Sequence, residues 1–229
     1  MSFTEKTQAY IVGKYYEKLW EKKGEQGKAV FVHAVKHYAM QRGSRMAQRV
    51  LRDGGKLDYA SFCRYGEWAP SREMLDAGTA CVKQVVRNLP DYEYHITRCP
   101  WHQQFQEMGQ SEAGRLYCGC LDEAILRGFN DEIPFHTAAT LHESDQCVFV
   151  VKDAQMPPEG SLTPRKGAVR DFAYHCAHTY YSFAEMIESV LGEEGKEIVK
   201  TVFCDFRKTW GQEMADQIES YQTENFNIY

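Results

Sequence analysis

Four of the eight cysteines lie within residues 99–147, together with a histidine and an aspartate. Cys118 and Asp122 are four residues apart in a segment with helical periodicity, so they share one helix face. A thiol attacks as the thiolate, and a neighbouring carboxylate raises the thiol pKa. The pair therefore favours nucleophilic chemistry only if a group such as His102 accepts the proton, or if Asp122 orients that base or binds substrate. The alternative is a buried helix cysteine beside a structural aspartate.

Cys99 and His102 lie on either side of Pro100 and Trp101, where a strand is expected to give way to a helix. The first amides of that helix could stabilise a thiolate at Cys99, and the helix dipole disfavours protonation of His102. A neutral imidazole serves as a general base or a metal ligand. Alternatively, Trp101 and Phe105 belong to the core and His102 to the surface.

Metal-ligand spacing is not evident in this segment. Cys118 and Cys120 form a C-x-C pair, whereas structural zinc sites use C-x₂₋₄-C pairs, and alternate residues of a helix point to different faces. We expect no metal and no cofactor. A metal-dependent hydrolase with cysteine or histidine ligands remains an alternative.

Two histidine pairs have spacings that could converge on one ligand. His33 and His37 are four apart, and His175 and His178 are three apart. For both pairs the alternative is solvated or core-edge histidines. The stretch around the second pair is polar and aromatic, which would suit a pocket wall, so we include His178 and Tyr181 among candidate substrate-binding residues.

Composition restricts the class of protein. The chain has 229 residues, 43% hydrophobic, with a net charge of −5 and no basic stripe, which argues against nucleic acid as a partner. No apolar run reaches membrane-spanning length, and the N-terminus does not resemble a secretory signal. We therefore expect a cytoplasmic protein, in which the cysteines are buried, metal-bound or catalytic rather than cross-linked.

Periodicity predicts one α+β domain over residues 1–229: a small, mainly antiparallel sheet packed with long amphipathic helices. Its parts are a helical stretch 1–90, the cysteine-rich segment 91–153 and a C-terminal helical pair 168–221. Helices are predicted over 27–49, 71–88, 100–109, 111–128, 168–191 and 194–220, strands over 92–98, 133–141 and 146–152, and a loop over 156–167.

The chain contains one internal repeat. Residues 24–50 align without gaps on residues 192–218, with seven of 27 positions identical, among them Gly24 with Gly192 and Gly27 with Gly195. Two amphipathic helices of similar composition could coincide by chance. Otherwise, two related helices pack in equivalent places.

The ordered motifs of the cysteine segment resemble the L-2-amino-thiazoline-4-carboxylic acid hydrolase family. The departure is Ser144-Asp145 before the last cysteine, where the family often has Gly-Asp. The motifs are Cys99-Pro100-Trp101-His102, Gly109, Tyr117-Cys118 with Asp122, Gly128-Phe129-Asn130, Thr140-Leu141 and Cys147 with Phe149.

This resemblance implies a hydrolase that acts on a non-peptide C–N bond, opening a small cyclic amidine, amide or thiazoline by attack at a ring carbon. Cys118 is the expected nucleophile, His102 the proton shuttle, and Asp122 the group that orients the base or binds substrate. The partner is a small molecule, and a homodimer is plausible. A sensor similar to the vinyl-reductase-like small-molecule-binding domains is the alternative. The expected substrate-binding residues are Cys99, Trp101, Tyr117, Cys147, His178 and Tyr181.

Overall fold

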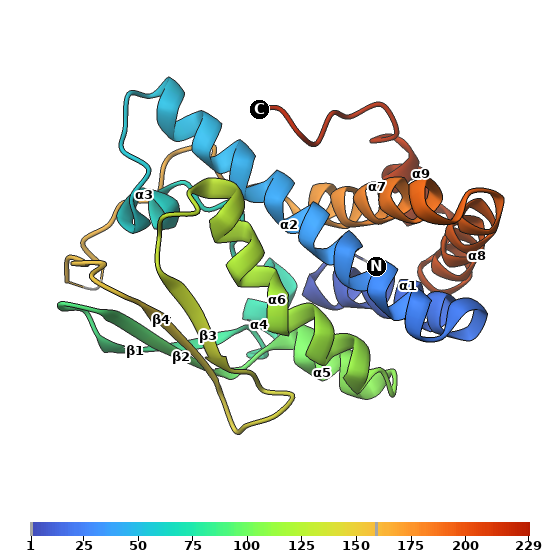
Figure 1. The fold of residues 1–229 in the computed structure, drawn as a ribbon, viewed down its shortest axis with the longest axis horizontal. Coiled ribbons are helices and arrows are strands. Elements are labelled where there is room, and N and C mark those ends of the chain that lie inside the picture. The colour runs from blue at the N-terminus through green and yellow to red at the C-terminus, as the bar shows by residue number, and fades with distance from the viewer. Residues whose placement is uncertain (1, 159) are drawn as a thin grey trace.

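The computed structural model describes residues 2–158 and 160–229, and within them nine helices accompany one four-stranded sheet. The predicted α+β class is confirmed. The sheet lies on one side of the molecule, most helices lie on the other, and α6 runs between them (Figure 1). The helices are α1 (Glu5–Lys23), α2 (Glu25–Arg52), α3 (Tyr59–Arg64), α4 (Arg72–Asp76), α5 (Pro100–Glu107), α6 (Ser111–Phe129), α7 (Phe172–Leu191), α8 (Glu193–Trp210) and α9 (Gln212–Glu219); the strands are β1 (Val82–Arg87), β2 (Tyr92–Arg98), β3 (Phe135–Ala139) and β4 (Cys147–Val151).

The sheet is antiparallel throughout, in the order β1-β2-β4-β3. Alternation places aromatic and aliphatic side chains on the face toward α6, as a half-buried sheet requires. On that face the Tyr94 and Phe149 rings stack at 4.9 Å, and Phe135 lies 5.8 Å from Phe149. The predicted strands 92–98, 133–141 and 146–152 are confirmed, although the second spans only Phe135–Ala139.

The prediction of a helix over 71–88 is wrong. Ser71 does cap a helix, accepting a hydrogen bond from the Met74 amide at 3.3 Å, but α4 ends at Asp76. The chain then forms strand β1, which pairs with β2. Its valines are β-branched and favour a strand once a partner is available, and that partner lies about ten residues further along the chain.

Two further helix predictions need correction. The N-terminal helix α1 was not among the predicted elements, although Glu5–Lys23 is helical and contributes much of the core. The predicted helix 194–220 is divided into α8 and α9 at Gly211, whose φ of 91° interrupts the helical path. Among the described residues, no helix is long and apolar enough to cross a bilayer.

The internal repeat corresponds to two similar helical hairpins, α1–α2 and α7–α8. Their turns have nearly the same backbone: Gly24 has φ 52° and ψ −126°, and Gly192 has φ 59° and ψ −129°. A side chain at Gly27 would meet the Leu19 carbonyl, and one at Gly195 would meet the carbonyl of Ile187, the equivalent residue. The repeat therefore encodes one tight helix–helix turn used twice.

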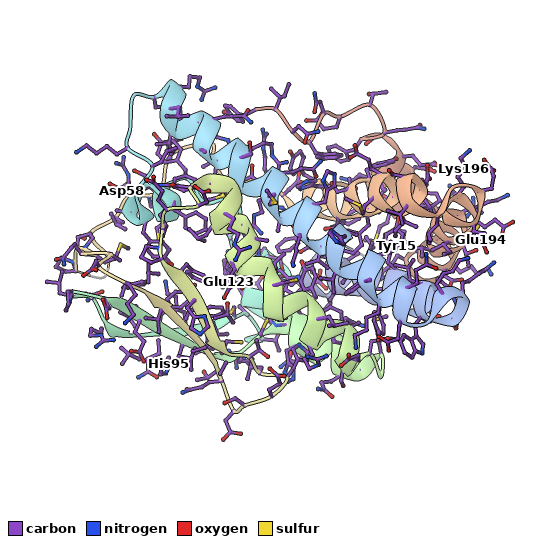
Figure 2. The ribbon with its side chains drawn as sticks, viewed as in Figure 1. Tyr15, Asp58, His95, Glu123, Glu194 and Lys196 are labelled. Atoms are coloured by element: carbon purple, nitrogen blue, oxygen red, sulfur yellow. The ribbon has the colours of Figure 1, made fainter. Side chains whose placement is uncertain are left out.

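A close approach of α2 and α6 fixes the position of the cysteine-bearing helix. A Cβ atom at Gly43 would lie 1.9 Å from the Ile125 carbonyl oxygen, and one at Gly128 would lie 2.3 Å from that of Met40. Two glycines, one on each helix, therefore let the backbones touch. Figure 2 shows Glu123 of α6 between the sheet that carries His95 and the helices that enclose Tyr15.

Candidate active site

Cys118 and Asp122 lie on α6, and both side chains are half-buried. Burial raises the pKa of Asp122 to about 6, and Arg42 of α2 acts against this shift. Within residues 2–158 and 160–229 no hydrogen bond from the protein contributes to the pKa of the Asp122 carboxylate. The nearby ring of Tyr94 on β2 is one of the groups that feels its charge. A carboxyl group with this pKa can exchange protons near neutral pH.

A β-bulge sets the direction of Cys99. Val82 pairs with Arg98, and Lys83 pairs with Ile96, so Thr97 is an extra residue in β2. Thr97 and Arg98 are both exposed, and alternation then turns Cys99 back toward the inner face. Cys81 precedes β1 and Cys99 follows β2, and the two thiols are neighbours that shift each other's pKa.

Cys99 is the N-cap residue of α5, which begins at Pro100. The Cys81 thiol and the backbone amides of His102 and Trp101 lower the pKa of Cys99, although burial and Asp122 act in the opposite direction. The neighbouring Cys99 thiol, followed by burial, raises the pKa of Cys81. Helix N-terminal amides stabilise a thiolate, so Cys99 is the thiol of this pair that ionises more readily.

The other cysteines of the segment have raised pKa values. Burial, followed by the neighbouring Cys99 and Cys147, raises the pKa of Cys118 well above its usual value. Burial also raises the pKa of Cys147 to about 11, although its sulfur accepts a hydrogen bond from the Leu141 amide at 3.3 Å. Cys120 is elsewhere on the helix and donates to the Leu116 carbonyl at 3.2 Å.

The four thiols of Cys81, Cys99, Cys118 and Cys147 therefore form one cluster with Asp122. All eight cysteines of the chain are free. In the described part of the chain, no three histidine, cysteine, aspartate or glutamate side chains are arranged to hold a metal ion. Of the predicted residues, the structure brings together Cys99, Cys118, Asp122 and Cys147.

His102 lies beside a second histidine that the sequence analysis did not identify. Its ring is 4.7 Å from the His142 ring, and its Nε2 atom is 3.3 Å from the Gln106 amide nitrogen. Burial lowers the pKa of His142 to about 4, and both of its ring nitrogens lack a hydrogen-bond partner. A side chain at Gly114 would lie 2.2 Å from this ring. His142 occurs in a polar turn, where no sequence signal marks it.

Trp101 and Tyr117 pack into the helical half of the protein. The indole nitrogen of Trp101 donates to Gln8 Oε1 at 3.0 Å, and its ring lies 5.5 Å from that of Trp68. Tyr117 is 2% exposed and packs on Phe105. Trp101 therefore links α5 to α1, whereas Tyr117 precedes Cys118 on the inner side of α6.

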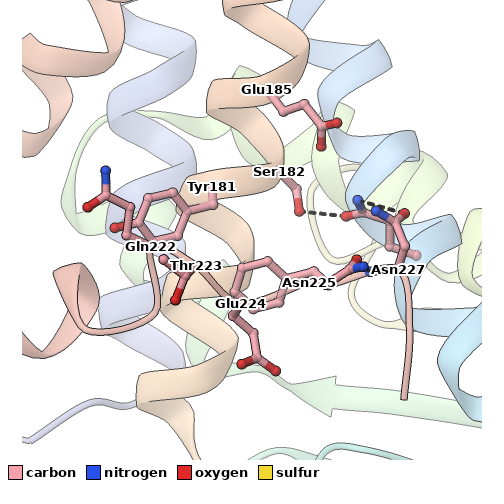
Figure 3. A pocket seen from close by; sticks show the side chains of 10 residues that line it. Tyr181, Ser182, Glu185, Gln222, Thr223, Glu224, Asn225 and Asn227 are labelled. Carbon is pink, nitrogen blue, oxygen red and sulfur yellow. Dashed lines mark hydrogen bonds between the residues drawn. The ribbon is translucent and has the colours of Figure 1, made fainter.

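His178 and Tyr181 lie on α7, in a different region. His178 is fully buried, accepts a hydrogen bond from Arg45 at 3.2 Å and contacts Gln41 at 3.0 Å. Tyr181 lines a separate hollow of about 310 Å³. Figure 3 shows this hollow, with the hydrogen bond that Ser182 donates to Gln41, and with the C-terminal residues 222–227 along its rim.

The two predicted histidine pairs do not converge on a ligand. His33 is exposed, whereas His37 contacts Glu185 at 3.0 Å. His175 contacts the Glu67 carbonyl at 3.0 Å through Nε2, while His178 points to Gln41. Each histidine therefore has its own protein environment.

A buried cluster of charges beside His178 was also missed. Glu67 receives a two-point contact from Arg45, at 3.2 and 2.8 Å, and a hydrogen bond from Arg49. Although burial alone would raise the pKa of Glu67, these guanidinium groups lower it to about 2. The sequence signal was a stripe: Tyr38, Arg42, Arg45 and Arg49 recur at spacings of four, three and four on a predicted helix.

Comparison with known proteins identifies a family. No curated protein and no solved structure matches the chain. A family model described as L-2-amino-thiazoline-4-carboxylic acid hydrolase matches residues 4–151, which run from α1 to the end of β4. The match includes the whole thiol cluster and Asp122, and excludes the α7–α8 hairpin. Because it covers more than half of the chain, this protein belongs to the L-2-amino-thiazoline-4-carboxylic acid hydrolase family.

Proposed function

We propose that this protein opens the ring of a small cyclic amidine, amide or thiazoline by hydrolysis, with a cysteine as nucleophile. The observation that carries the proposal is the position of Cys99 at the start of α5, in one cluster with Asp122. A thiolate can serve as the nucleophile in covalent hydrolysis of such a ring, and a carboxyl group of near-neutral pKa can serve as its general base. The family to which the chain belongs supports this class of reaction.

The electrostatics favour Cys99 over Cys118 as the nucleophile. The pKa of Cys99 is lowered by the Cys81 thiol and by its place at the start of α5, whereas burial raises the pKa of Cys118 well above its usual value. In this proposal Cys118 lines the site beside Asp122. His102 contributes its backbone amide to Cys99, and its ring lies with His142.

The proposed reaction has two stages. The Cys99 thiolate adds to the electrophilic ring carbon, and the ring bond at that carbon breaks as the departing atom takes a proton from the substrate's own protonated nitrogen. Water then attacks the enzyme-bound carbon and releases the thiol. The ionised form of Asp122 holds the positively charged nitrogen of the substrate in the first stage and accepts the proton of water in the second.

Alkylation of single cysteines tests the choice of nucleophile. With limiting iodoacetamide at pH 7, we expect Cys99 to be labelled at least about tenfold faster than Cys118, read by peptide mass spectrometry. Cys99→Ala should abolish turnover of L-2-amino-thiazoline-4-carboxylic acid, and Cys120→Ala is the matched control that should retain it. A fully active Cys99→Ala variant would refute the assignment of Cys99 as the nucleophile. An inactive Cys118→Ala variant in which Cys99 is still labelled rapidly would indicate Cys118 as the nucleophile instead.

A further inference from the structure

The buried charges beside α6 do not balance within the protein. Arg42, Arg45 and Arg49 lie on one face of α2 and share a single carboxylate, Glu67. Arg45 contacts both carboxylate oxygens and Arg49 contacts one of them. Arg42 is 4.0 Å from the carboxylate and forms no hydrogen bond with any described residue.

Aromatic rings and carbonyl groups compensate the other two arginines. The Arg45 guanidinium lies 5.5 Å from the Tyr174 ring centre, and that of Arg49 lies 4.4 Å from the Tyr229 ring centre. Arg45 also donates to a backbone carbonyl. In the described part of the chain, Arg42 has neither kind of contact. Its side chain is 16% exposed, and its Nε atom is buried without a hydrogen bond. Arg42 is therefore a cation held inside the protein with only a long contact to a carboxylate that two other arginines already bind.

The histidines nearby do not alter this balance. Burial lowers the pKa of His175 to about 3 and that of His178 well below its usual value, so both are neutral at pH 7. The remaining acid near Arg42 is Asp122, whose charge acts on the guanidinium from α6. Burial and the charges of Arg42 and Glu123 set the pKa of Asp122, and no hydrogen bond contributes to it. A cation and an acid, both half-buried and neither held by a hydrogen bond within the described residues, thus lie beside the thiol cluster.

We propose that Arg42 is the specificity-determining residue that binds the carboxylate of a small zwitterionic substrate, while Asp122 holds its positively charged nitrogen. The inference rests on the proposed function for the place where the substrate reacts. A guanidinium fork forms two parallel hydrogen bonds to a carboxylate, and such bonds are strong where water is largely excluded. A substrate carboxylate would also supply the negative charge that the arginine stripe lacks.

A matched pair of ligands tests the assignment of Arg42. L-2-amino-thiazoline-4-carboxylic acid carries the carboxylate, and 2-amino-2-thiazoline is the same ring without it. By calorimetry, the wild-type protein should bind the acid roughly 10- to 100-fold more tightly than it binds 2-amino-2-thiazoline. Arg42→Gln should remove this preference by lowering the affinity for the acid while leaving the affinity for 2-amino-2-thiazoline unchanged. Arg42→Lys should restore part of the preference.

Stability measurements separate this role from a structural one. Arg42→Gln should not lower the midpoint of thermal unfolding, because it removes a largely buried charge that forms no hydrogen bond with the described residues and has only a 4.0 Å contact with Glu67. Arg45→Gln is the control and should lower the midpoint, because it breaks the contact with Glu67. An Arg42→Gln protein that keeps its preference for the acid, or a wild-type protein that shows none, including one that binds neither compound, overturns the inference. Preferential binding of the acid without turnover would support the role of Arg42 in binding the carboxylate and would refute the proposed hydrolase activity instead.

Discussion

Replacing Asp122 by asparagine should stabilise the folded protein and remove its activity. The carboxylate is half-buried on α6 without a hydrogen-bond donor, and burial raises its pKa to about 6 from the 3.8 of an exposed aspartate. A group with a raised pKa binds its proton more tightly in the folded state, so its ionisation destabilises the fold as pH rises. Asparagine has a similar shape and carries no charge to desolvate.

The size of this effect follows from the pKa shift. A shift of about two pKa units lowers the free energy of unfolding by about 3 kcal/mol once Asp122 is fully ionised, which is the case above pH 7. At pH 5 the folded protein keeps most of the proton on Asp122, and burial of this side chain lowers the free energy of unfolding by only about 1.5 kcal/mol. The advantage of Asp122→Asn over the wild type should therefore grow by about 1.5 kcal/mol between pH 5 and pH 8.

Urea unfolding at pH 5 and pH 8 measures both values, with exposed Asp131 as the control site. Asp131→Asn should change the free energy of unfolding by less than about 0.5 kcal/mol at either pH. Turnover of the Asp122→Asn protein should fall by at least about 100-fold. Two results would show that the carboxylate has a structural partner and that the reasoning is wrong. One is an Asp122→Asn protein less stable than the wild type at pH 8, and the other is a stability difference from the wild type that is the same at both pH values.

Three further outcomes are expected. In the pH profile of the wild type, kcat/KM should rise through about pH 6 and then level, because the ionised form of Asp122 binds the substrate nitrogen; a profile that falls through pH 6 would contradict this role. Gly43→Ala should destabilise the protein by about 3 kcal/mol or more, because its Cβ would meet the Ile125 carbonyl. Gly119→Ala on α6 is the control: its Cβ would meet nothing, so it should be neutral or stabilising by up to about 1 kcal/mol. Chemical denaturation measures both changes. Glu67→Gln should cost about 3–5 kcal/mol of unfolding free energy, because it leaves buried guanidinium groups without their carboxylate. A loss below about 1 kcal/mol, the size expected for an exposed ion pair, would refute the charge balance.

The internal repeat shows how far local patterns can be interpreted. The alignment of residues 24–50 on 192–218 predicted two helices that pack in equivalent places, and Gly24 and Gly192 have nearly the same backbone angles. The same pattern failed at its end: Gly43 continues α2, whereas the equivalent Gly211 separates α8 from α9. A glycine permits either outcome, and the packing of α2 on α6 decides between them.

The site shows the same division. The residue types, their order and the helix carrying Cys118 and Asp122 were determined by the sequence, because helical spacing is a local property. The sequence also led to the family and to the α+β class. It favoured Cys118 as the nucleophile, since Cys118 has a carboxylate on its own helix face.

Only the tertiary structure decided the electrostatic environment of each group. Cys99 faces the cluster because Thr97 bulges from a pairing with β1, a strand that periodicity assigned to a helix. The Asp122 pKa depends on the depth of α6. Arg42 stays 4.0 Å from Glu67, a residue of a separate loop, because Arg45 and Arg49 already bind that carboxylate. Secondary structure follows largely from contacts a few residues apart, whereas ionisation and charge balance depend on segments that only folding brings together.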